Sequence, residues 1–181
     1  NRLSYASYFI DLLNQLTEVE DPNLPIFDLL YESLLFLERG ASPKRSARIY
    51  EIKLLELLGL MPEIKTCVKC QASLPDPAYF SVVFGGILCH NCALHSKNVS
   101  PNAPLRSLKV PAGGGNTVIP VSKGVLNFLE HARRSPLREM DNVKVSQEVG
   151  EGLEKVLRSF VDFHLAYKLK SVVFLEKMAY V

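Results

Sequence analysis

The sequence predicts a mostly α-helical protein, in which a four-cysteine zinc β-ribbon is inserted into a helical bundle. Two observations support this fold class. Apolar residues recur at helical spacing towards both ends of the chain, and four cysteines gather as two C-x2-C pairs in a β-prone middle. We expect residues 1–61 to form the first part of the bundle, residues 62–104 the ribbon, and residues 105–181 a linker and the second part. With 48% apolar and 22% charged residues among 181, the composition is globular.

Three helices are expected before the cysteines, over residues 3–19, 24–39 and about 43–58. Ser4 is a possible cap for the first. For the third, Ser42 and Pro43 match the N-cap and first helical positions. The second segment is apolar on more than one face, so we expect it to be the most buried helix. The short connections indicate an antiparallel bundle.

The middle of the chain contains strand and loop signals. A β-prone run, Gly85-Gly86 and a short second run predict a hairpin over residues 79–88. Residues 101–120 contain four prolines and three consecutive glycines, so we expect a loop; the Lys-Ser/Thr of a phosphate-binding P-loop is missing. Helices are expected over residues 122–134, capped by Ser122, and over 146–178 with a break near 164–170. No apolar run is long enough to predict a transmembrane helix.

The cysteines form the pairs Cys67/Cys70 and Cys89/Cys92, separated by 18 residues. Each pair presents two thiolates from a tight turn, so a hairpin could close four sulfurs around one structural Zn²⁺. Such a site is coordinatively closed and leaves no position for a water nucleophile, which argues against a hydrolase. Two local disulfides or a thioredoxin-like redox pair are the alternatives, although neither flank offers a βαβ pattern.

The net charge of +2 is small, but its distribution is uneven. Residues 1–40 carry 2 basic and 7 acidic groups, whereas residues 71–140 carry 7 basic and 3 acidic groups. A basic middle permits an anionic partner, although solvated helix faces explain the same charges. We find no G-x-S-x-G or H-E-x-x-H motif, so we expect a binding protein and not an enzyme. The candidate DNA-binding residues are Lys44, Arg45, Arg133, Arg134, Lys168 and Lys170.

The order of short motifs resembles the RecO family of bacterial recombination mediators. No single motif is decisive, and the likeness rests on their order and spacing over roughly residues 5–175. The likeness is strongest over residues 47–92. The motifs are YFIDLL at 8–13, RIYEIKLL at 48–55, Leu58-Gly59, the first cysteine pair, an aromatic strand, GGILC at 85–89 with Cys92, and LKS at 169–171.

This resemblance implies an N-terminal OB-fold joined to a helical domain that a zinc ribbon interrupts. It also implies binding to single- and double-stranded DNA, annealing of strands covered by single-stranded-DNA-binding protein, and RecA loading with RecR. The expected location is the cytoplasm, at the nucleoid, without a membrane. The helical part begins at residue 3, so we expect no OB-fold within this chain. The alternative function is a zinc-ribbon protein-interaction or transcription-associated adaptor without direct DNA binding, which salt-dependent DNA binding would distinguish.

The resemblance further implies a site for the acidic, Phe-ending tail of single-stranded-DNA-binding protein. Arg48 matches an arginine in that region of the family, and Arg45 is its neighbour on the same helix face. We expect these two arginines to bind carboxylates, and Tyr8 and Leu12 to supply a notch for the ring. The alternative is that Arg48 pairs only with Glu51, three residues further along its own helix.

Overall fold

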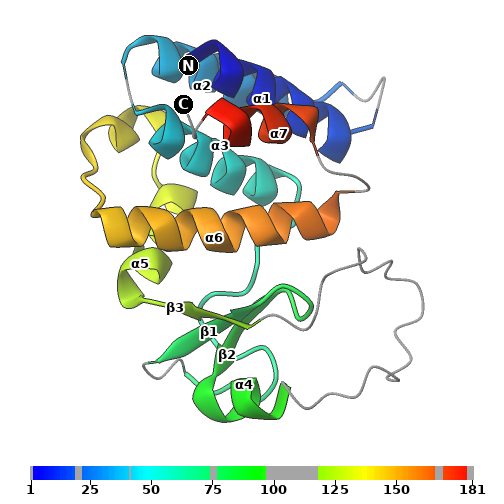
Figure 1. Ribbon diagram of the computed structural model, residues 1–181, viewed down its shortest axis with the longest axis vertical. Coiled ribbons are helices and arrows are strands. Elements are labelled where there is room, and N and C mark those ends of the chain that lie inside the picture. The colour runs from blue at the N-terminus through cyan, green and yellow to red at the C-terminus, as the bar shows by residue number, and fades with distance from the viewer. Residues whose placement is uncertain are drawn as a thin grey trace.

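A computed structural model describes residues 2–18, 22–40, 42–73, 77–96, 118–165 and 169–178. Most helices gather at one end of the molecule, a small sheet with α4 lies at the other, and α6 crosses between them (Figure 1). The mostly helical fold with an inserted cysteine ribbon is therefore confirmed. The elements are α1 (Arg2–Leu16), α2 (Leu24–Glu38), α3 (Pro43–Leu57), β1 (Ala78–Ser81), β2 (Gly86–Cys89), α4 (His90–Ser96), β3 (Val118–Val121), α5 (Lys123–Arg134), a 3-10 helix (Leu137–Asn142), α6 (Gln147–His164) and α7 (Lys170–Met178).

The centre of the bundle is α3, which contacts α1, α2, α5 and α6. Nine of its 15 residues are buried, against five of 15 in α2, so our expectation that the second helix is the most buried was wrong. The reason is position. Because α2 packs mainly on one side, it leaves Leu24, Phe27 and Tyr31 more than half exposed despite its apolar sequence.

The helix starts follow the predicted capping signals in part. Ser122 precedes α5, and its side chain accepts a hydrogen bond from the Val125 N–H, as expected. Ser42 occupies the N-cap position before Pro43, but its side chain makes no capping hydrogen bond. Ser4 lies inside α1 and does not cap it. A cap therefore depends on the backbone geometry around the residue and not on residue type alone.

The predicted break in the last helical stretch is present, because α6 ends at His164 and α7 begins at Lys170. Helix α7 then packs against α1 (Figure 1). Asp11 of α1 accepts hydrogen bonds from the Ser171 N–H and hydroxyl, with its Oδ2 at 3.2 and 2.7 Å. A side chain from the first helix thus satisfies a free N–H in the first turn of the last helix.

The sheet is antiparallel with strand order β2-β1-β3. The β1–β2 hairpin was predicted, but β3 lies partly within residues 101–120, which we expected to be loop. Pro120 pairs with Tyr79 in this strand, and a proline without an N–H is tolerated there because β3 is an edge strand. Helix α4 was also not predicted. Since β3 lies beyond residue 104, we propose that the ribbon's sheet extends to Val121.

The two faces of the sheet have different roles. Phe80 and its partner Ile87 face the main core, where the Phe80 ring meets Phe160 of α6 edge-on at 5.6 Å. The adjacent pair, Tyr79 and Leu88, faces the cysteines on the other side. Successive residues of a strand point to opposite faces, so this hairpin attaches the cysteine cluster to the helical core. In the part of the chain that the structure describes, no helix is both long and apolar enough to cross a membrane.

Candidate functional site

The four cysteines converge at one end of the molecule. The first pair lies in the loop before β1, whereas Cys89 ends β2 and Cys92 lies in α4. Their sulfur atoms all lie within 4.8 Å of one another, and the Cys70 and Cys89 sulfurs are 3.8 Å apart. A tetrahedral zinc ion with Zn–S bonds of about 2.3 Å places its sulfurs about 3.8 Å apart, so the cluster has the size of a zinc site.

The backbone around the first pair suits a thiolate ligand. Burial raises the pKa of the Cys67 thiol, but N–H groups of Cys70, Cys89 and Lys69 that donate to its sulfur lower this pKa to about 6. Gln71 takes a left-handed φ of 58° directly after Cys70, a conformation that glycine adopts most readily. A non-glycine residue therefore makes the turn that closes the knuckle.

Two histidines beside the cluster are exposed and are not needed as ligands. His90 hydrogen-bonds through Nδ1 to the Tyr79 hydroxyl at 3.2 Å, and His95 lies in the last turn of α4. The group of four cysteines is complete without them. The residues therefore fit a closed four-sulfur site for one zinc ion, whose role would be to hold the ribbon together and not to activate water.

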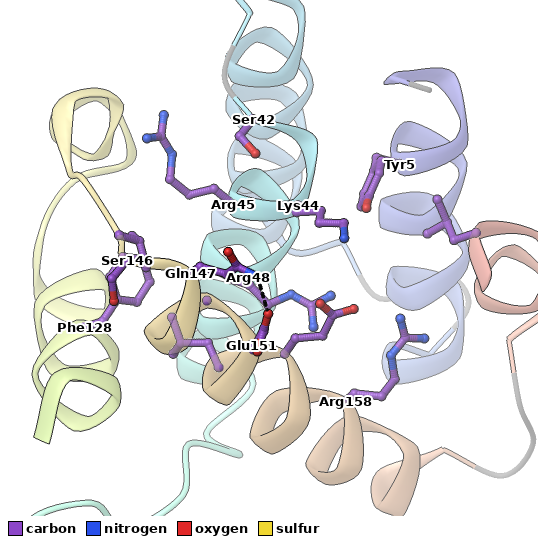
Figure 2. Close-up of a pocket in the computed structure, with 15 residues that line it drawn as sticks. Tyr5, Ser42, Lys44, Arg45, Arg48, Phe128, Ser146, Gln147, Glu151 and Arg158 are labelled. Atoms are coloured by element: carbon purple, nitrogen blue, oxygen red, sulfur yellow. Dashed lines mark hydrogen bonds between the residues drawn. The ribbon is translucent and has the colours of Figure 1, made fainter. Parts of the chain in front are cut away.

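A second candidate site is a pocket of about 510 Å³ between α1, α3 and α6, with one lining residue each from α5 and α7. Figure 2 shows Lys44, Arg48 and Arg158 extending into the space between these helices, whereas Arg45 extends from α3 away from Tyr5 and Arg158. Four cations line the pocket, together with two carboxylates and an apolar wall. The cations are Lys44, Arg45, Arg48 and Arg158, the carboxylates are Glu151 and Glu154, and the apolar wall comprises Phe128, Val145, Leu153 and Leu175.

Arg48 is 7% exposed and is held from beneath by a buried carboxylate. Its Nη2 lies 2.7 Å from Glu51 Oε1, which also accepts a hydrogen bond from the Tyr8 hydroxyl at 2.5 Å. Burial raises the pKa of Glu51, and the Arg48 guanidinium opposes that rise. Within the described residues, Arg48 Nη1 and Glu51 Oε2 are buried without a hydrogen-bond partner. The local pair foreseen as the alternative therefore forms, while Arg48 also lines the pocket.

Only some of the residues expected to bind the peptide tail line the pocket. Arg45 and Arg48 line the pocket together, but Tyr8 and Leu12 are 1% and 0% exposed and belong to the core. They are not positioned to form a notch, because both lie on the face of α1 that packs into the bundle. Tyr5, one turn earlier in α1, lines the pocket instead.

The DNA-binding candidates do not form one continuous group. Lys44 and Arg45 share the pocket, and the Arg45 Nη1 also donates to the Val143 carbonyl at 3.0 Å. Arg133 and Arg134 both pair with Glu130, at 3.0 and 2.6 Å. Lys170 is exposed at the start of α7, and Lys168 lies outside the described residues.

Sequence reasoning missed the contribution of α6 to the pocket. Glu151, Glu154 and Arg158 recur at intervals of three and four residues, which places them on one face of the helix. The spacing was a signal, but it does not distinguish a charged pocket wall from an ordinary exposed face.

These features define a class of protein: a mostly α bundle with a four-cysteine ribbon folded into it and a cation-lined pocket on its helices. The family described as "Recombination protein O C terminal" matches residues 1–112 and 111–172. The chain therefore belongs to the RecO family of DNA repair proteins, as the motif order indicated.

Several curated relatives carry the name "DNA repair protein RecO". The chain is 30% identical over 176 residues to the protein of Pelotomaculum thermopropionicum, covering 97% of this chain and 61% of that protein. It is 30% identical over 179 residues to the Desulforamulus reducens protein, covering 98% and 62%, respectively. Identity to the Caldicellulosiruptor saccharolyticus protein reaches 40% over 88 residues, 49% of this chain and 36% of that protein. The chain thus spans about three fifths of the length of the first two relatives.

Proposed function

We propose that this chain acts in a RecO-type DNA repair and recombination mediator. It would bind single- and double-stranded DNA, RecR and the tail of single-stranded-DNA-binding protein, and so support strand annealing and RecA loading. Its work would be binding and not catalysis, in the cytoplasm at the nucleoid. Family membership and the relatives' names support DNA repair; the partners and the steps are our proposal.

The observation that carries this proposal is the combination of charges and apolar surface in one pocket. Lys44, Arg45 and Arg48 line the same pocket as the half-buried apolar side chains Val145 and Leu175. An acidic peptide with a terminal aromatic residue needs both kinds of contact at once. Arginine suits the carboxylate because its planar guanidinium can donate two parallel hydrogen bonds.

DNA binding would rely on the exposed cations. Lys44, Lys170 and Arg134 are exposed, whereas Arg133 is engaged by Glu130 and by Glu56. Arg134 must share the Glu130 carboxylate with Arg133 in the free protein, so we expect weak binding. Each phosphate contact should add about −0.9 to the slope of log affinity against log salt concentration for duplex DNA.

The zinc ion would have a structural function in this proposal. A ribbon of this size cannot build a core large enough to fold alone, so metal ligation substitutes for apolar burial. The cluster lies on the face of the sheet opposite the helical core. Zinc would therefore fix the outer face of the ribbon while Phe80 and Ile87 anchor its inner face.

The test is titration of a labelled acidic peptide ending in Phe into the wild-type chain and its variants. Lys44→Ala is the first variant, because Lys44 is exposed and its loss should not affect folding. Arg48→Ala should weaken binding by about tenfold or more, since truncating one partner of a desolvated charge pair typically costs 2–5 kcal/mol. Arg138→Ala, exposed on the 3-10 helix outside this pocket, is the control.

Equal affinities for the wild-type chain, Lys44→Ala and Arg48→Ala would refute the peptide site. DNA binding has its own test, a salt titration with duplex and single-stranded oligonucleotides. Binding that is absent at low salt, or that does not change with salt, would favour the adaptor without direct DNA contact.

A further inference from the structure

The α6 side of the pocket contains charged groups to which no role has been assigned. Arg158 lines the pocket from α6, opposite Arg48 of α3. Both side chains extend into the space that α1, α3 and α6 enclose (Figure 2). The two arginines come from distant parts of the sequence and are brought together because α3 packs against α6.

Both arginines contain a donor that the protein does not satisfy. Within the described residues, Arg48 Nη1 and Arg158 Nη1 are buried and have no hydrogen-bond partner. The Arg158 guanidinium lies 5.9 Å above the Tyr8 ring, a cation–π contact that holds it but leaves the hydrogen bond unmade. A buried donor without a partner costs free energy, so an acceptor that enters the pocket gains affinity from both helices.

The start of α6 favours the same kind of ligand. Ser146 caps this 18-residue helix and lines the pocket together with Gln147. The N-terminal end of a helix carries partial positive charge, which attracts anions. On this wall the helix end and Arg158 act in the same direction. Arg48, which is 7% exposed and whose Nη1 has no partner within the described residues, faces them.

Two carboxylates on α6 oppose an anion. Glu151 is engaged, because its Oε1 accepts a hydrogen bond from Gln147 Nε2 at 2.8 Å (Figure 2). Glu154 lines the pocket, and its negative charge acts on both Arg48 and Glu51. A bound carboxylate would therefore have Glu154 as its nearest like-charged competitor on this helix.

We propose that the acidic ligand is held between α3 and α6, with Arg158 as a second guanidinium that acts with Arg48, and with Glu154 limiting the affinity. This inference rests on the proposed function, since it concerns how the same pocket recognises the acidic peptide. It adds a residue, a second helix and a repulsive group to the site. Its consequence is that the ligand links α3 to α6.

The sharpest test is a substitution that should strengthen binding. Glu154→Gln removes the opposing charge with little change in shape, and we expect affinity for the acidic, Phe-ending peptide to rise about two- to fivefold. Glu148→Gln makes the same change at an exposed position of α6 outside the pocket and should leave affinity unchanged. Since a misfolded variant does not bind more tightly, this result cannot come from damage to the fold.

The complementary test removes the second guanidinium. Arg158→Gln should weaken peptide binding by about tenfold, whereas Lys155→Gln, exposed on the same helix, should not. Hydrogen exchange measured with and without peptide should show slowed exchange in both residues 44–48 and residues 147–158. A ligand that contacts α3 alone would slow only the first segment.

The outcomes separate this inference from the proposed function. If the wild-type chain does not bind the peptide, both fail. If it binds, but Arg158→Gln matches Lys155→Gln, or Glu154→Gln weakens binding, or α6 gains no protection, the α6 half of the site is wrong and the peptide site on α3 remains.

Discussion

Tyr8→Phe is the most informative single substitution for the stability of the bundle. Tyr8 is 1% exposed, and its hydroxyl donates to Glu51 Oε1 at 2.5 Å from a residue 43 positions away in the sequence. The substitution keeps the ring, so it removes this hydrogen bond without creating a large cavity. Glu51 then depends on Arg48 alone, because its Oε2 has no partner among the described residues.

The expected loss follows from that geometry. A hydrogen bond to a charged group stabilises a fold by about 1.5–3 kcal/mol, and the loss of a bond that leaves a buried acceptor under-satisfied costs an amount within this range. We therefore expect the free energy of unfolding to fall by about 2 kcal/mol. For a chain of this size that corresponds to a decrease in Tm of about 4–8 °C.

Urea denaturation of the zinc-loaded chain, followed by circular dichroism, measures this quantity. The transition midpoint should fall while the slope m stays constant, because the amount of surface exposed on unfolding does not change. Tyr31→Phe is the matched control, since Tyr31 is 56% exposed on α2. If Tyr8→Phe stays within about 0.5 kcal/mol of that control, the buried Tyr8–Glu51–Arg48 network does not stabilise the fold as we argue.

Three further outcomes are expected. Cys89→Ser should abolish stoichiometric zinc binding, measured by metal analysis, and speed hydrogen exchange in β1 and β2 while most helical circular dichroism remains. Asp11→Ala should lower the free energy of unfolding by about 1 kcal/mol and speed hydrogen exchange in α7. Both effects should be larger than those of Ser171→Ala, because Asp11→Ala removes both hydrogen bonds. Burial raises the pKa of Tyr50 above its ordinary value of 10.0. The stabilisation from burying the neutral Tyr50 hydroxyl is therefore complete below pH 10.0 and is lost as pH rises. Tyr50→Phe should make the free energy of unfolding depend less on pH in this alkaline range.

Local sequence predicted the elements whose signals are themselves local. The apolar spacing of α3, Pro43 at its start and Gly59 after its end predicted that helix to within about a residue. The cysteine spacing and Gly85-Gly86 predicted the ribbon hairpin. Gly85 has a φ of 63°, and a Cβ on Gly86 would lie 2.6 Å from the Glu63 carbonyl oxygen, so both glycines are required by the backbone.

Elements that depend on a distant partner were not predicted. The β3 strand contains Pro120 and forms only because β1 offers it a free edge, which four residues of sequence do not reveal. The burial ranking of α2 and α3 also depends on their neighbours, since α3 is enclosed by other helices and α2 is not. Helix propensity and apolar content therefore predicted the existence of these helices but not their depth in the fold.

The sequence by itself determined the long helices, the two cysteine pairs and the family, because periodicity, C-x2-C spacing and motif order can be read along the chain without knowing the fold. Only the tertiary structure decided what surrounds Arg48. Its pairing with Glu51 is local, but the Tyr8 hydroxyl beneath and Arg158 across the pocket arrive from other helices. Packing of α1, α3 and α6 buries Arg48 and Glu51 and, within the described part of the chain, leaves one guanidinium nitrogen of Arg48 and one of Arg158 without a hydrogen-bond partner. That desolvation makes the pocket a candidate anion site, whereas the same residues on isolated helices would be solvated.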